Sequence, residues 1–385
     1  MASEVTVGKL IGHLRLDVRG WVRGIATAQQ KMTRFGTNLF FLGSRITAGI
    51  GVPLGILAGS VIKVGMAFDQ AMTESLAIID KVTPKIRRQM EDTAKTIAVT
   101  TKFSAKEAAE AYFFLASSGL NAAESIRALP VAANFAQAGV IGLEKATELL
   151  SDAYISLGLR SQDPIQNMQN MRRVADVLTE ANNRAQGTIQ EFAEALTNRA
   201  AVAFRVFGIS VEEGVAALAA FAERGIKGRT AGRQMFIVIR DLQRSVIKNT
   251  DAWDALVGEG AVFDKATHEF KNLADIIEVL EDSMEGLSDE TKKTKFTLLG
   301  FQERSLQATL ALMGASERIR EFEAHFKSAF GVTARVAEKQ MASFENQLHR
   351  LTERVKISGI NTFDAFRETL ERWVAPMLMK LVKCI

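Results

Sequence analysis

Residues 101–125 read TKFSAKEAAEAYFFLASSGLNAAES, and this stretch decides the fold class. Ser104 is followed three residues later by Glu107, which is the spacing of a capping box. In that motif the hydroxyl and the carboxylate each accept a hydrogen bond from a backbone amide at the start of a helix. Gly119 follows an apolar run, and glycine adopts the left-handed conformation that ends many helices. Because Asn121–Glu124 repeats the start signal in a weaker form, the stretch predicts two short helices joined by a tight turn.

The same signals recur through residues 101–247. Thr188 precedes Glu191, and Ser210 precedes Glu213, with the capping-box spacing. Glycines that follow apolar runs predict helix ends at Gly119, Gly139, Gly158, Gly187, Gly208 and Gly225. The sequence therefore predicts a mainly α fold: an array of short helices with glycine-capped turns, a short N-terminal strand and longer C-terminal helices.

Composition favours helices and excludes several kinds of site. Proline, which breaks helix interiors, accounts for 5 of 385 residues, or 1.3%, against about 5% in average proteins. The single cysteine, Cys384, excludes a disulfide within the chain and a cysteine-based zinc cage. The 48 basic and 44 acidic residues give a net charge of +4, which is too even to indicate nucleic-acid binding by itself. We expect no metal site, because the four histidines are far apart in sequence: His13, His268, His325 and His349.

Two N-terminal segments depart from the helical pattern. Residues 10–18 alternate apolar and polar side chains, which predicts a half-buried strand in an N-terminal strand–helix region at 1–36. Residues 46–62 form 17 consecutive uncharged positions, at the lower limit of about 17–25 residues for a membrane-spanning helix. Two interpretations are open, a buried or self-associating helix and a membrane-active segment. The side chains that would make either contact are Ile46, Ile50, Leu54, Ile56, Leu57 and Val61.

The C-terminal part carries a second candidate surface. Glycines near residue 260 indicate an exposed turn or a short hairpin, and helices are predicted at 273–284, 289–299, 304–313 and 317–330. Apolar side chains then recur at spacings of 3, 4, 3 and 4, the pattern of a helix seam that packs on another helix: Met341, Phe344, Leu348, Leu351 and Val355. Beyond the N-terminal region we predict a Gly-rich apolar segment at 37–66, a helical core at 67–248, a helical extension with the hairpin at 249–331, and amphipathic, coiled-coil-like helices at 332–385.

No catalytic constellation stands out. The Glu–Ser pairs at Glu74 and Glu124 give weak support to a cell-wall hydrolase, because Glu124 already has a role in a helix cap. The loop GIKGRTAG at 225–232 lacks the spacing of a phosphate-binding P-loop, so we interpret it as a turn between packed helices. Residues 223–248 hold seven basic and two acidic side chains, a net charge of +5 (7 − 2), with Phe236 as the only aromatic. A solvated or protein-contacting helix face explains this charge better than a nucleic-acid surface does.

The order of short motifs gives the chain a family resemblance. The motifs are AFDQAM at 67–72, TKFSAKEAA at 101–109, LASSGL at 115–120, VADVL at 174–178, GISVEE at 208–213, and RGIKG at 224–228 with AG at 231–232. In this order they resemble the core region of bacteriophage tail tape measure proteins, with Ser118 in place of the usual alanine.

The resemblance implies a structural assembly protein rather than an enzyme, without a cofactor. Members of this family occupy the lumen of the growing tail, and their helical length measures it, since a helix rises about 1.5 Å per residue. The implied partners are the tail tube protein, tail assembly chaperones, tail tip or baseplate proteins and further copies of the chain, with no specific nucleic-acid binding. The implied locations are the tail lumen of the virion, the host cytoplasm during assembly and, through residues 46–62, the host inner membrane during infection. The alternative is a membrane-perforating genome-delivery effector without a role in length.

Overall fold

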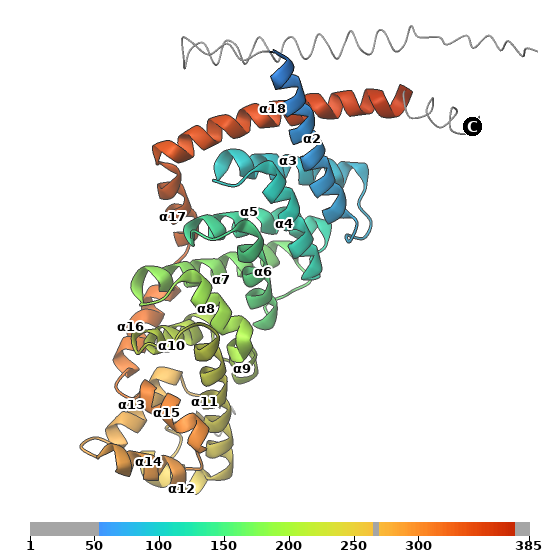
Figure 1. Cartoon of the computed structure of the whole chain (residues 1–385). Helices are drawn as coiled ribbons and strands as arrows, with labels where there is room; N and C mark the ends of the chain where they lie inside the picture. Colours follow the sequence, from blue (N-terminus) through green and yellow to red (C-terminus); the bar gives the residue numbers. More distant parts are fainter. Residues whose placement is uncertain (1–53, 265–268, 374–385) are drawn as a thin grey trace, which may run out of the picture. The chain divides into compact units, whose positions relative to one another are not determined.

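The computed structural model describes residues 54–264 and 269–373, and within them the chain is mainly α-helical (Figure 1). Contacts divide the chain into two units, residues 1–67 with 355–385 and residues 68–354. The predicted strand at 10–18 lies outside the described residues.

The first unit is described from the start of helix α2 (Leu54–Leu76) and the later part of helix α18 (Phe344–Trp373). Gly65 lies directly against Phe363: a Cβ added to the glycine would come within 2.3 Å of the Phe363 ring. The sequence predicts a helix from about Val64 to Lys81, and both of these boundaries are wrong. The helix begins earlier because glycines cost it only about 1 kcal/mol each, which is too little to break a helix.

The second unit consists of short helices that follow one another through tight turns. They are α3 Pro84–Thr100, α4 Ala105–Ser117, α5 Ala122–Ala138, α6 Leu143–Ser156, α7 Pro164–Arg184, α8 Ile189–Ala195, the π-helical turn η1 Leu196–Ala200, α9 Ala201–Phe207, α10 Val211–Glu223, α11 Gly228–Lys248, α12 Thr250–Val257, α13 Leu273–Ser283, α14 Asp289–Leu298, α15 Glu303–Leu312, α16 Ser316–Lys327 and α17 Val332–Met341. Two short antiparallel strands follow the glycines near residue 260. They are β1 Phe263–Asp264 and β2 Glu269–Phe270, with Phe263 opposite Phe270.

Two helices form the centre of this unit. Helix α5 packs against α3, α4, α6, α7 and α17, and α10 packs against α7, α11 and α16 (Figure 1). Both are rich in alanine and are buried over most of their circumference. A helix that is apolar all round belongs in a core, and small side chains let neighbouring helices approach closely.

Among the described helices, capping boxes start three. Both halves of the motif form at α4, α5 and α8, so the prediction is confirmed there, including the signal before α5 that looked weaker in sequence. At α10 the Ser210 hydroxyl accepts from the amide of Glu213 at 3.1 Å. The Glu213 carboxylate also reaches α13, where it accepts from the Leu273 amide at 2.6 Å, so a local motif contributes to tertiary structure.

Glycines end four of the predicted helices as expected, and two glycines have a different role. The left-handed conformation is confirmed at Gly119, Gly158, Gly208 and Gly225. The prediction of a left-handed glycine is wrong at Gly139, which has φ −81°. The next residue, Val140, adopts the left-handed conformation instead, with φ 54°. Gly187 is not among the residues with positive φ either. Added Cβ atoms would lie 3.2 Å from Ile189 at Gly139 and 2.8 Å from Phe192 at Gly187, so these glycines permit close packing on α8.

Candidate functional site

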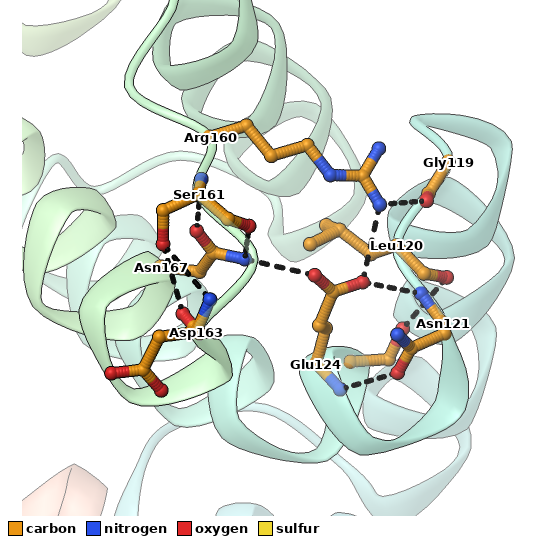
Figure 2. Close-up of polar contacts among 9 residues, drawn as sticks. Gly119, Leu120, Asn121, Glu124, Arg160, Ser161, Asp163 and Asn167 are labelled. Carbon is orange, nitrogen blue, oxygen red and sulfur yellow. Dashed lines mark hydrogen bonds and ion pairs between the residues drawn. The ribbon is translucent and has the colours of Figure 1, made fainter.

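A buried carboxylate, Glu124, lies at the centre of the polar cluster in Figure 2. Its side chain is 6% exposed. One oxygen, Oε2, accepts from the backbone amide of Asn121 at 2.8 Å and from the guanidinium of Arg160 at 3.3 Å. The other oxygen, Oε1, accepts from the side-chain amide of Asn167 at 2.9 Å. Because both oxygens are engaged, this carboxylate is held as a hydrogen-bond acceptor.

The partners of Glu124 extend the cluster to neighbouring loops. Arg160 also donates to the carbonyl of Gly119 at 2.8 Å, at the turn between α4 and α5. The Asn167 side chain accepts from the Ser161 amide at 2.7 Å and donates to the Ser161 carbonyl at 3.0 Å (Figure 2). The cluster therefore joins the α4–α5 turn to the segment between α6 and α7, and its chemistry is that of a structural joint.

The titratable groups Tyr154 and Glu74 do not provide Glu124 with a partner for acid–base catalysis. Burial, and secondarily the charge of Glu124, raise the pKa of the Tyr154 hydroxyl to about 12, so this group is protonated at neutral pH. Glu74, the other glutamate of a Glu–Ser pair, accepts from Gln70 at 2.8 Å on an exposed part of α2. Among the residues that the structure describes, no group of three or more His, Cys, Asp and Glu side chains is placed to hold a metal ion.

The apolar N-terminal segment is described only in part. Ile46 and Ile50 lie outside the described residues, and the other four candidates lie in the first turns of α2, where the backbone alone is described: Leu54, Ile56, Leu57 and Val61. Within residues 54–264 and 269–373, no single helix has the length and apolar character to cross a bilayer. Helices α5 and α6 meet that criterion only as a pair, bent by 114°.

The predicted helix seam is divided by a break between two helices. Met341 ends α17 and is buried, whereas α18 begins at Phe344. The exposed fractions of Phe344, Leu348 and Leu351 are 76%, 44% and 38%, and Val355 is half-buried. Since these first three positions are i, i+4 and i+7, they share one face of α18.

A serine marks the break in the seam. The hydroxyl of Ser343 accepts from the backbone amide of Asn346 at 3.3 Å, which is the geometry of a helix N-cap. This capping residue is the sequence signal that the heptad interpretation missed.

The described part of the chain is thus a helical protein with a buried polar joint around Glu124 and an exposed apolar face on α18. A family model for phage-related minor tail proteins matches residues 91–300, which is more than half of the chain. The chain belongs to the phage-related minor tail protein family.

Two curated relatives carry more specific names. The chain is 26% identical to the "Tape measure protein" of Pneumococcus phage Dp-1 over 390 aligned residues, covering 98% of this chain and 32% of that protein. It is 25% identical over 324 residues to the "Probable tape measure protein" of Escherichia phage P2, covering 82% of this chain and 38% of that one. The chain thus spans about a third of the length of these relatives. No solved structure matches it.

Proposed function

We propose that this chain is a structural, non-enzymatic component of a phage tail, of the tape-measure type. In this role it occupies the lumen of the tail tube and guides tail assembly and length. The observation that carries the proposal is the similarity to a tape measure protein over 98% of the chain. Because the chain covers 32% of that relative, the proposal assigns it the role of one part of the measuring apparatus.

The structure supports a division of labour within the chain. A ruler requires that distance increase with residue number, and the 30 residues of α18 extend about 45 Å as one helix. In the unit at 68–354 the chain instead returns on itself: Gln137 donates to Gln340, 203 positions later, at 3.3 Å. We therefore assign measurement to extended helices such as α18 and assign assembly to the compact unit.

Exposed apolar side chains supply the proposed contacts. The α18 face formed by Phe344, Leu348 and Leu351 fits a partner helix, either from a further copy of the chain or from the tail tube protein, an assembly chaperone or a tip or baseplate protein. Residues 46–62 would contact the host inner membrane during genome delivery. Dye release from liposomes by the full chain, abolished by Ile56→Asp, tests that membrane contact; release that persists in the variant overturns it.

Tail length tests the measuring role. Insertion of about 42 residues of continuous helix after Ser358, in α18, should lengthen tails by roughly 63 Å in electron micrographs. An insertion of the same length at the Gly258–Gly260 turn of the compact unit is the control, and tails carrying it should keep their length. Unchanged tails in both cases, or equal lengthening in both, would overturn the division of labour.

A further inference from the structure

An open cavity of about 570 Å³ lies on the compact unit at 68–354, where α11 packs against η1 and α15. Its lining is strongly basic and includes one aromatic ring: Asn198, Arg199, Arg233, Phe236, Arg240 and Arg304. We name it the arginine cavity. The α11 arginines are visible in sequence as a basic run, whereas Arg199 and Arg304 join them only through the fold.

The charge of the arginine cavity is largely uncompensated. Arg240 is paired with the buried carboxylate of Asp241 through contacts of 2.8 and 2.6 Å. Within the described part of the chain, Arg199, Arg233 and Arg304 form no ion pair, and all three are exposed. Three guanidinium groups therefore face solvent around one hollow, and like charges gathered in this way attract an anion.

An unusual backbone conformation positions one of these arginines, Arg199. Arg199 has φ 79° inside the η1 break, a left-handed conformation that is uncommon for residues other than glycine. Its guanidinium lies 5.8 Å from the centre of the Phe236 ring. Gly232 lets α11 approach this break, since a Cβ there would lie 2.1 Å from the carbonyl oxygen of Ala195. The η1 break and α11 thus pack tightly together, and this packing holds the side of the cavity that they form in place.

A basic stripe continues beyond the cavity along α11. Arg229, Arg233, Arg240 and Arg244 are spaced by 4, 7 and 4 residues, so they share one helix face. Arg229 lies 3.9 Å from the Glu194 carboxylate, which is a long distance for an ion pair. From the first to the last arginine the stripe extends about 22 Å, which matches about six phosphates of a stacked strand at 3.4 Å each. A stripe of this length fits a polymer of phosphates better than it fits a single anion.

We propose that the arginine cavity and its stripe bind the phosphate backbone of a nucleic-acid strand without regard to sequence, with the face of Phe236 stacking on a base. Arginine forks match phosphate geometry in two-point contacts, and an aromatic ring beside a basic groove is the usual platform for single strands. This inference is independent of the tape-measure role, and neither requires the other.

Fluorescence anisotropy of a labelled oligothymidylate of about 20 nucleotides tests the proposal on the full chain. The variant Arg199→Gln/Arg233→Gln/Arg304→Gln should bind at least tenfold more weakly at low salt. The slope of log affinity against log salt should fall by about 2, since each phosphate contact on a single strand contributes about 0.7. The pair Arg233→Gln/Arg304→Gln, which leaves the η1 backbone untouched, should show about two thirds of that change.

Controls of equal charge separate this site from general attraction. Arg88→Gln/Arg172→Gln/Lys293→Gln removes three exposed positive charges elsewhere and should leave binding within about twofold. Phe236→Leu should weaken binding of the oligonucleotide but not of inorganic tripolyphosphate. The proposal is overturned if the control triple loses as much affinity as the cavity triple, if polyglutamate competes as well as the oligonucleotide, or if the unaltered chain does not bind.

Discussion

Replacing Glu124 by glutamine measures how much the buried joint contributes to stability. The carboxylate gives one oxygen to the Asn121 amide and the other to the Asn167 side chain, at 2.8 and 2.9 Å. A glutamine offers one oxygen and one NH2 group, so one of these two donors must face another donor. Because an unsatisfied buried donor costs about 1–3 kcal/mol, and the lost pairing with half-exposed Arg160 adds at most about 1 kcal/mol, we expect a loss of roughly 1–4 kcal/mol.

The capping box at α4 provides a matched control. Glu107 occupies the same motif position, but it is exposed, and within the described residues its carboxylate accepts hydrogen bonds from Ser104 alone. Glutamine is an accepted residue at this position of a capping box, so Glu107→Gln should cost less than about 0.5 kcal/mol. Urea unfolding followed by far-ultraviolet circular dichroism compares both variants with the unaltered chain. A Glu124→Gln variant that unfolds at the same urea concentration as Glu107→Gln would refute the reasoning.

Three further predictions address packing, titration and assembly. Gly232→Ala forces a Cβ to within 2.1 Å of a backbone carbonyl and should lower the free energy of unfolding by about 3 kcal/mol, whereas Gly142→Ala, with nothing within 4 Å, should change it by less than about 1 kcal/mol. Burial raises the pKa of Glu213 above its ordinary value, so the folded state binds this proton more tightly than the unfolded state does. The contribution of Glu213 to the free energy of unfolding therefore falls as pH rises from about 4 through the folded pKa. Glu213→Gln should therefore gain stability relative to the unaltered chain between pH 4 and pH 7 in urea titrations, and a constant difference would contradict this. Leu348→Asp with Leu351→Asp should leave the melting temperature nearly unchanged and reduce self-association in analytical ultracentrifugation; identical sedimentation would remove the α18 face as a contact surface.

The C-terminal seam illustrates the limit of a purely periodic argument. The spacing of apolar residues predicted one surface from Met341 to Val355, but the chain ends a helix at Met341 and starts another at Phe344. Met341 enters the core because α17 packs on α5 and α7, contacts that lie more than 150 residues away in sequence. The remaining face at Phe344, Leu348 and Leu351 is exposed, and its role in assembly stays a prediction.

Local signals in the sequence by themselves determined the helical class and the ends of several helices. Capping boxes and left-handed glycines act through hydrogen bonds between residues at most five positions apart, so they can be recognised in a stretch such as 101–125.

Only the tertiary structure decided which of these residues have a second role. It placed Asn167 and Arg160 around Glu124, turned the Glu213 carboxylate to another helix, and gave Val140 rather than Gly139 the left-handed turn. It also gathered Arg199, Arg233 and Arg304, from three separate elements, around one cavity. These outcomes depend on contacts between residues distant in sequence, where shape and burial select the partner, and no short-range pattern encodes that choice.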